Sequence, residues 1–78
     1  MIGEIIAIGD ELTSGRITNT TSGYAARQLF LLGHTVVAMH TIGDAPELIG
    51  ETLKAAIARA DFVLVTGGLG ATTHDLTN

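Results

Sequence analysis

Hydrophobic residues along the chain form three short runs, separated by longer stretches in which apolar positions recur with helical spacing. The first run, residues 4–9, is continuously apolar after its leading glutamate. A run without period-two alternation is typical of a strand that is buried on both faces of a sheet. Residues 34–40 and the β-branched run at 62–65 predict a second and a third strand.

The stretch between the first two runs predicts a loop followed by a helix. Residues 10–18 are mostly polar, which favours a loop. Residues 19–22 are all of types that cap helix N-termini, and Gly33 is a good terminator because glycine adopts the left-handed conformation easily. The apolar stripe predicted for this helix consists of Ala25, Leu29 and Leu32.

The stretch between the second and third runs predicts another helix. Asp44 is placed to cap it, Pro46 is tolerated in a first turn, and Glu47 completes a capping-box pattern. Arg59 lies in the predicted last turn, where a cation suits the negative end of the helix. The predicted core stripe, with a period close to that of an α-helix, is Ile49, Leu53, Ala56, Ile57 and Ala60.

The order of elements is therefore strand, helix, strand, helix, strand. Alternation of this kind predicts parallel strands joined by right-handed crossovers, and hence an α/β sandwich with strand order 2-1-3. This order places a topological switch point between the first and third strands, where ligands of open α/β sheets bind. The strand ends that meet there are at residues 9–11 and 66–68.

Length and composition set bounds on the fold. The chain has 78 residues, of which 46% are hydrophobic, enough for one small core. A chain of this size buries only about 60–65% of its unfolded surface, and common domains have about 100–150 residues. We therefore treat residues 1–78 as a single domain.

Charge and cysteine content limit the partners and the compartment. The formal net charge is −4 with only four basic side chains, so a nucleic-acid partner is not expected. No apolar run approaches the roughly 18 residues that span a bilayer, so no membrane partner is expected either. The absence of cysteine and of a basic N-terminal signal region favours a cytoplasmic location.

A glycine-rich sequence follows the third run and is the strongest candidate for a binding site. Residues 66–70 read Thr-Gly-Gly-Leu-Gly, which is neither a P-loop nor a dinucleotide fingerprint. Glycines let backbone N–H groups approach an anion closely, so the sequence favours a seat for phosphate or pyrophosphate. The alternative is a tight strand-to-helix turn in which the glycines serve backbone geometry alone.

Several carboxylates lie near the predicted strand ends. Asp75 follows the glycine-rich sequence and is a candidate to hold a divalent cation or position a water, with a helix cap as the alternative. Asp44 has the same two interpretations. Asp10 and Glu11 form an acidic pair at the switch point, where they would bind a metal or a ribose hydroxyl unless they are solvated loop acids. Arg16 is a candidate for a phosphate contact.

The histidines are weaker candidates. His74 lies beside Asp75 and is a candidate metal ligand or proton donor, although the sequence shows no further histidines or cysteines near it that would complete a metal site. His34 and His40 bracket the second predicted strand, and we interpret both as strand-end residues without a ligand. No pattern typical of nucleophilic catalysis is present in the sequence.

Four motifs in order along the chain resemble the molybdopterin-binding domain superfamily. They are residues 6–12 (Ile-Ala-Ile-Gly-Asp-Glu-Leu), 15–20 (Gly-Arg-Ile-Thr-Asn-Thr), 42–44 (Ile-Gly-Asp), and 66–70 with 75–77 (Asp-Leu-Thr). The form Thr-Gly-Gly-Leu-Gly, rather than Thr-Gly-Gly-Thr-Gly, is similar to the N-terminal domain of CinA-type, competence/damage-inducible proteins more than to the MogA/MoaB branch.

The resemblance implies a three-layer α/β fold that binds a pterin or a nucleotide pyrophosphate on the glycine-rich loop. In the MogA-like branch, acids at the places of Asp44 and Asp75 are implicated in molybdenum cofactor assembly. In the CinA-like branch, the domain is associated with metal-dependent ADP-ribose pyrophosphatase activity. The implied cofactors are a divalent metal such as Mg²⁺, with molybdopterin or a nucleotide as ligand.

The chain departs from the family pattern in two ways. Ala71 stands where the family has proline, and His74 stands where it has the first acid of an acidic pair. The family domain also continues with further helices and strands, so residues 1–78 are expected to form the first half of such a domain. An uncovered sheet face then predicts a homo-oligomer or a partner that covers it.

Three functions follow as hypotheses: a metal-dependent hydrolase of a nucleoside diphosphate sugar such as ADP-ribose, a non-catalytic binding module, and a half-domain inactive without a partner. Asp44 and Asp75 are the predicted catalytic and metal-binding pair. The residues predicted to bind the phosphate-containing ligand are Thr66, Gly67, Gly68, Gly70, Thr72, Asp10, Glu11, Arg16 and Asn19.

Overall fold

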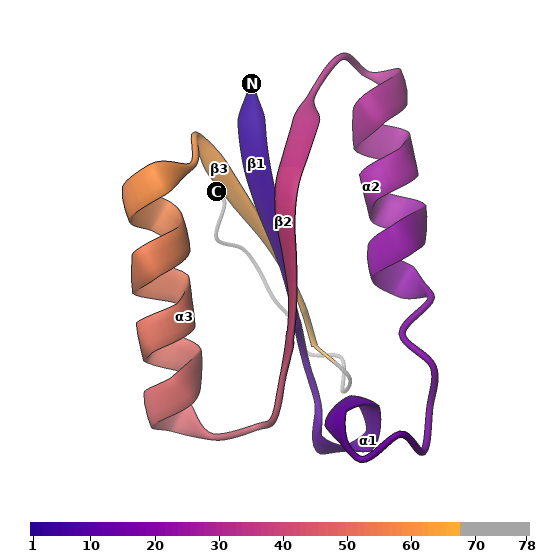
Figure 1. The fold of residues 1–78 in the computed structure, drawn as a ribbon, viewed down its shortest axis with the longest axis vertical. Helices are drawn as coiled ribbons and strands as arrows, with labels where there is room; N and C mark the ends of the chain where they lie inside the picture. The colour runs from indigo at the N-terminus through magenta and orange to yellow at the C-terminus, as the bar shows by residue number, and fades with distance from the viewer. Residues whose placement is uncertain (68–78) are drawn as a thin grey trace.

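The fold was obtained as a computed structural model, which describes residues 1–67 of the chain. Three strands and three helices follow one another in the order shown in Figure 1. They are β1 (Ile2–Ile8), α1 (Asp10–Thr13), α2 (Thr21–Leu31), β2 (Thr35–Ile42), α3 (Pro46–Arg59) and β3 (Phe62–Gly67).

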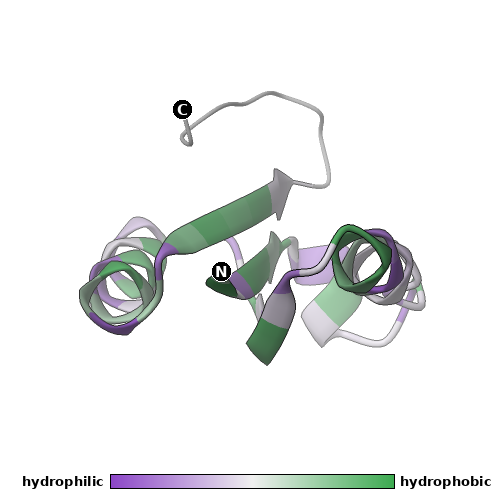
Figure 2. Ribbon diagram, turned by 90° about the horizontal axis from the view of Figure 1, so that it is seen from above, coloured by the Kyte–Doolittle hydropathy of each residue, from purple (hydrophilic) through white to green (hydrophobic). Residues whose placement is uncertain are grey.

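The three strands form one parallel sheet with the order β2-β1-β3, which confirms the predicted topology. The strands lie between the two long helices, with α2 on one side of the sheet and α3 on the other (Figure 2). The helix α3 packs against β1 and β3, whereas α2 packs against β2 and β1. The three-layer α/β arrangement is thereby confirmed.

The central strand is the most deeply buried element of the fold. Residues 3–7 of β1 are all buried, as the continuous apolar run predicted. On the α3 side, Ile6 packs with Ala56 of α3 and Val63 of β3, and these three residues form the centre of the core. Alternate β1 residues therefore face opposite helices, and neither face of this strand meets solvent.

The segment after β1 was predicted as a loop, and this prediction was wrong for its first four residues. The short helix α1 begins at Asp10, and the Gly9 carbonyl accepts the N–H groups of Leu12 and Thr13 at 3.1 and 3.3 Å. Two acids in its first turn suit the positive end of a helix. A single polar turn has no apolar periodicity, so the sequence pattern cannot reveal it.

The start of α3 also differs from the prediction. Asp44 does not cap the helix: the N-cap residue is Ala45, and no side-chain cap bond is formed. The second strand runs on to Ile42, two residues beyond its predicted end, which leaves only a short turn before the helix. The Asp44 carboxylate is therefore not used in helix capping.

Two residues of the predicted helical stripes lie outside the core. Leu32 follows the last residue of α2 and is 73% exposed, and Ile57 of α3 is 59% exposed. The described sheet has only three strands, so each helix covers it along a narrow strip. Small residues such as Ala56 make the closest contact, because they allow the helix to approach the sheet.

Gly3, near the start of β1, lies in close contact with the ring of Phe62. A Cβ added at Gly3 would overlap the ring of Phe62, which in turn packs edge-on against His34 with ring centroids 5.4 Å apart. We expect Gly3→Ala to reduce the free energy of unfolding by about 1–3 kcal/mol, because the aromatic ring must be displaced. Urea unfolding of the variant and the parent chain measures the difference.

The matched control is Gly50→Ala in α3, where nothing lies within 4 Å of the added Cβ. This change is expected to increase stability by about 0.5–1 kcal/mol, since glycine is a poor residue for a helix interior. Equal stability of Gly3→Ala and the parent would show that the Phe62 ring can move without cost.

Candidate functional site

The carboxyl ends of the three strands meet at one edge of the sheet. Ile8, the last residue of β1, lies beside Ile42 of β2 and Gly67 of β3 in the strand register. The Gly9 N–H also donates a hydrogen bond to the Ile42 carbonyl at 3.0 Å. The loops that begin at these strand ends are thus neighbours, as the predicted switch point requires.

Asp10 and Asp44, 34 positions apart in the sequence, are in contact at this edge. The Asp44 backbone N–H donates a hydrogen bond to Asp10 Oδ1 at 2.9 Å. Gly43 makes this approach possible, since a Cβ at that position would lie 3.0 Å from Asp10 Oδ1. The structure therefore brings together two of the predicted acids.

Glu11 lies at the same edge, against the end of β1. A Cβ added at Gly9 would come within 2.7 Å of Glu11 Oε2, so the carboxylate covers the backbone of Gly9 closely. Gly9 itself is buried, whereas Glu11 is half-buried. The Glu11 carboxylate is therefore a third predicted acid at the end of β1.

Asn19 connects the segment before α2 to the end of β2. Its Nδ2 donates to Thr41 Oγ1 at 3.2 Å and to Ser22 Oγ at 3.0 Å, and its Oδ1 accepts the Ser22 N–H at 3.3 Å. Both ends of the Asn19 amide thus have partners within the protein, and Ser22 is only 3% exposed.

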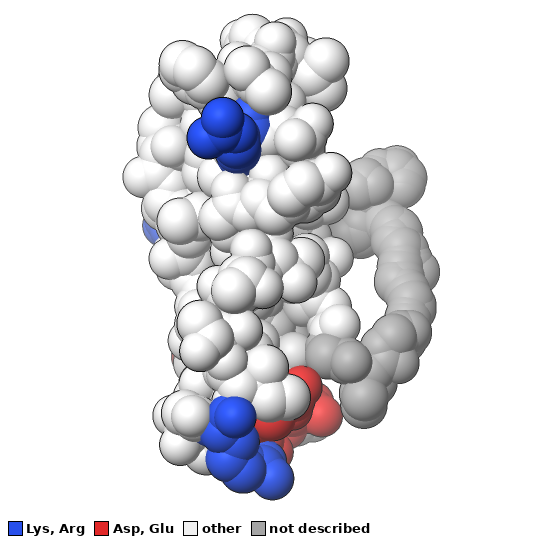
Figure 3. Space-filling view, turned by 90° about the vertical axis from the view of Figure 1, so that its right-hand side faces the viewer, with Lys and Arg blue, Asp and Glu red and all other residues white. Residues whose placement is uncertain are grey.

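Arg16 is exposed on the same segment, and its Nε donates to Ser14 Oγ at 2.9 Å. Acidic and basic side chains gather at the end of the molecule that carries α1 (Figure 3). The described residues therefore leave the guanidinium in contact with solvent, at the end of the molecule where the strands terminate.

The remaining predicted site residues follow β3. Thr66 lies beside Ala7 of β1 in the register and is half-buried, and Gly67 is the last residue of the strand. The other predicted residues, Gly68, Gly70, Thr72 and Asp75, together with His74, lie outside the described residues. The described part of the site thus consists of the ends of the three strands together with α1 and the segment that follows it.

The chemistry of these residues is compatible with a hard cation, although the described set is small. Within residues 1–67 no group of three or more His, Cys, Asp or Glu side chains is placed to hold a metal ion. Magnesium commonly uses one or two carboxylates together with the phosphates of its substrate. The Asp44 carboxylate fits that requirement only together with further donors.

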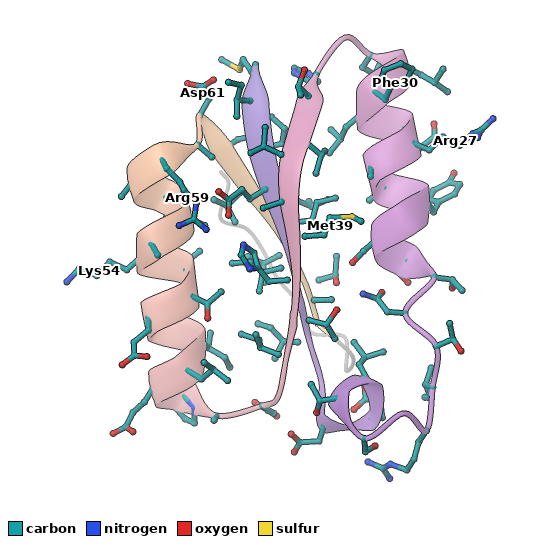
Figure 4. The ribbon with its side chains drawn as sticks, viewed as in Figure 1. Arg27, Phe30, Met39, Lys54, Arg59 and Asp61 are labelled. Atoms are coloured by element: carbon teal, nitrogen blue, oxygen red, sulfur yellow. The ribbon has the colours of Figure 1, made fainter. Side chains whose placement is uncertain are left out.

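The sequence pattern did not predict a buried charged cluster on the α3 side of β1. Glu4 is 0% exposed, and its Oε2 accepts from Arg59 Nε at 2.5 Å while its Oε1 accepts from Arg59 Nη2 at 2.9 Å. His40 Nε2 lies 2.7 Å from Glu4 Oε1. Figure 4 shows Arg59 on the last turn of α3. His40, predicted to end the second strand, thus lies within β2 and contacts a buried acid.

One signal in the sequence points to this cluster. Glu4 is the only charged residue in a run that is otherwise apolar, and a buried acid requires a counter-charge. Arg59 lies in the last turn of α3 as predicted, and its pairing with Glu4 is a second role beside the interaction with the helix dipole. The cluster joins β1, β2 and α3 on the α3 side of the sheet. We therefore assign it a role in stabilising the fold.

Glu4 makes the stability of the chain dependent on pH. The hydrogen bonds from Arg59 hold the pKa of Glu4 below its usual value; burial opposes this effect, and the contact with His40 adds to it. A carboxyl whose pKa is lower in the folded state stabilises the fold above its unfolded pKa, about 4.3. That contribution is lost as the pH falls through the folded-state pKa.

We therefore expect the urea midpoint of the parent chain to fall between about pH 5 and pH 3 more steeply than that of Glu4→Gln. Glu47→Gln, which neutralises an exposed acid in the first turn of α3, is the control and is expected to keep the parent slope. Parallel slopes for Glu4→Gln and the parent would contradict the assignment to Glu4.

Comparisons with known proteins identify relatives over nearly the whole chain. Residues 4–78 match the family model described as "Probable molybdopterin binding domain". A CinA-like protein of Desulfotalea psychrophila is 69% identical over 96% of this chain, which covers 18% of that protein. A protein of Natranaerobius thermophilus, described as competence-damage inducible, is 44% identical over 99% of this chain, which covers 19% of that protein.

A solved structure shares the fold. The crystal structure of CinA from Thermoplasma acidophilum, a protein of unknown function, superposes with a TM-score of 0.84 and 28% identity. The match covers 90% of this chain and 43% of that chain. The chain thus spans less than half of the solved protein and about a fifth of the two longer relatives.

Proposed function

Because the chain belongs to the molybdopterin-binding domain family, and is CinA-like within it, we propose that it binds a nucleotide or pterin pyrophosphate at the carboxyl edge of its sheet. One observation carries this proposal: the ends of β1, β2 and β3 lie side by side, at Ile8, Ile42 and Gly67. The position is the switch point at which open α/β sheets bind ligands.

The glycine-rich sequence that begins at the end of β3 supports an anionic ligand. Backbone N–H groups at Gly67, Gly68 and Gly70 would donate hydrogen bonds to the pyrophosphate oxygens. The chain carries a net charge of −4, so its own lysines and arginines cannot neutralise a diphosphate. A divalent cation held by Asp44 and Asp75 would supply that charge and activate water when bound.

We further propose that the ligand is hydrolysed and that ADP-ribose represents the substrate class. Water would add across the P–O–P linkage, so that one P–O bond breaks and AMP and ribose 5-phosphate are released. The Asp44 carboxylate, which is not used in helix capping, would accept a hydrogen bond from the attacking water. A location in the cytoplasm, where such nucleotides are abundant, is part of this proposal.

A second candidate function is binding without turnover. His74 stands where the family has the first acid of its acidic pair, and the loss of a carboxylate weakens any site for a hard cation. The two functions are distinguished by incubating the chain with ADP-ribose and Mg²⁺ and measuring AMP by chromatography. AMP formation that EDTA abolishes supports the hydrolase, and binding without AMP supports the module.

We also propose that the chain associates with a second copy through its apolar surface. No described helix has the length and apolar character needed to cross a bilayer. Figure 4 shows Phe30 near the end of α2 and Met39 on β2. The exposed apolar residues in this region are Tyr24, Phe30, Leu31, Leu32, Val37 and Met39, each more than half exposed.

Light scattering after size-exclusion chromatography tests this association. We expect a mass of at least two chains, and we expect Phe30→Lys to shift the chain toward monomer, because a charge in an apolar interface is costly to desolvate. Arg27→Lys, which keeps the charge at an exposed position of the same helix, is the control. A monomer at all concentrations of the parent chain would contradict the proposal.

A further inference from the structure

We propose that Asp10 is a positioning residue: through its bond to the Asp44 backbone N–H, it fixes the turn that carries Asp44 at the edge of the binding site. The consequence for ligand binding rests on the proposed function above. The contact itself does not, because it is a bond between two described residues.

The first step of the argument is the contact between the two residues. Asp10 Oδ1 accepts the Asp44 N–H at 2.9 Å, across 34 positions of sequence. The Ala45 N–H donates to the Gly43 carbonyl at 3.0 Å, which closes a tight turn around Asp44. The Asp44 backbone is thus fixed by its own N–H and by the turn that contains it.

The second step is the packing that holds Asp10 in place. A Cβ at Gly43 would lie 3.0 Å from Asp10 Oδ1 and 3.7 Å from Thr13 Oγ1, so glycine at this position lets α1 approach the turn. Asp10 is the first residue of α1, and the preceding Gly9 N–H is bonded to the Ile42 carbonyl. The contact therefore connects two elements that are already aligned by the sheet.

A second hydrogen bond between distant segments lies close to the Asp10–Asp44 bond. Asn19 Nδ2 donates to Thr41 Oγ1 at 3.2 Å, three residues before Asp44. The segment between α1 and α2 is thereby bonded to β2 through the Asn19 amide, while α1 itself is bonded to the turn after β2 through the Asp10 carboxylate. Both hydrogen bonds restrain the stretch of chain from Thr41 to Asp44.

The third step is the distinction between a hydrogen-bond acceptor and a charge. A backbone N–H needs an oxygen lone pair and does not need a full negative charge, whereas a cation site loses strength when a carboxylate becomes neutral. An asparagine at position 10 keeps an oxygen at the place of Oδ1 and removes the charge. A positioning role therefore predicts that Asp10→Asn is mild and Asp10→Ala is severe.

The test combines amide exchange with ligand titration on the full chain. The exchange of the Asp44 amide with water, measured by ¹⁵N NMR, is expected to quicken at least about tenfold in Asp10→Ala and to change little in Asp10→Asn. Calorimetric titration with ADP-ribose and Mg²⁺ is expected to show an affinity about tenfold weaker in Asp10→Ala and within about threefold of the parent in Asp10→Asn. Glu51→Gln, an exposed acid of α3, controls for the change in net charge.

Two results would overturn the proposal. If the Asp44 amide exchanges at the parent rate in Asp10→Ala, the contact does not hold the turn. If Asp10→Asn protects the amide but loses as much affinity as Asp10→Ala, Asp10 acts on the ligand through its charge. A parent chain that binds no ADP-ribose contradicts the proposed function, while amide exchange still decides the positioning role. Asp10→Leu, which keeps the branched shape of the side chain and has no acceptor, replaces Asp10→Ala if the alanine variant does not fold.

Discussion

Replacing Arg59 by methionine is expected to lower the midpoint of thermal unfolding by more than about 10 °C. The substitution retains an unbranched side chain that can pack along α3, but it removes both hydrogen bonds to the carboxylate of Glu4. Glu4 is 0% exposed in the middle of the sheet, so its charge would be buried with His40 as its only described side-chain partner. A buried charge that loses its partner is among the most costly changes in a small domain.

The measurement is thermal unfolding followed by circular dichroism at neutral pH. Arg27→Met is the matched control, because Arg27 has no salt-bridge partner among residues 1–67 and projects from α2. The double variant Glu4→Gln/Arg59→Met is expected to recover part of the loss, since no charge is then buried alone. Equal midpoints for Arg59→Met and Arg27→Met would show that the cluster does not stabilise the fold.

Replacing Asp44 by asparagine is expected to reduce AMP release from ADP-ribose on the order of 100-fold. The loss of one carboxylate from a cation site removes several kcal/mol of charge stabilisation, and each 1.4 kcal/mol is about tenfold in rate. The backbone N–H that bonds Asp10 is retained in this variant, so the turn between β2 and α3 is expected to stay folded. The effect would therefore be on chemistry and not on stability.

Initial rates of AMP formation at saturating Mg²⁺ measure this prediction. The control is Glu47→Gln, which removes an exposed acid three residues further along, in the first turn of α3. It is expected to retain the parent rate. An Asp44→Asn variant with the parent rate would exclude the carboxylate from the reaction, and the proposed hydrolase would then need another acid.

The order and arrangement of the strands could be predicted from the sequence because each step depends on local pattern and handedness. The apolar run before Gly9 and the spacing of Leu53 and Ala56 identify element types without any knowledge of contacts. Right-handed crossovers then restrict the topology to a few choices. The observed order β2-β1-β3 follows from these rules.

Features that depend on contacts between distant segments could not be predicted in the same way. The pairing of Glu4 with Arg59 joins residues 55 positions apart, and the bond from Asp44 to Asp10 joins residues 34 positions apart. Local pattern favoured a helix cap for Asp44 and a dipole interaction for Arg59. The cap is not formed, and Asp44 contacts α1, whereas Arg59 lies in the last turn as predicted and in addition pairs with β1, because the sheet brings these elements close together.

In the candidate site, too, the position could be predicted from the sequence, whereas the contacts of individual side chains could not. Its place at the carboxyl edge follows from topology, and the structure brings Asp10, Glu11 and Asp44 to that edge with Gly67. The roles of individual side chains depend on their contacts. The amide of Asn19, for example, is bonded to Ser22 and Thr41, contacts that the sequence does not indicate, and its role in ligand binding stays a prediction.

The most direct test of a pyrophosphate site at the sheet edge is calorimetric titration of the chain with ADP-ribose, with and without Mg²⁺. We predict saturable binding that is stronger with the cation and weakened in Asp44→Asn, while Glu47→Gln binds as the parent does. A folded parent chain that binds no ADP-ribose in the presence of Mg²⁺ would contradict a complete site within these 78 residues.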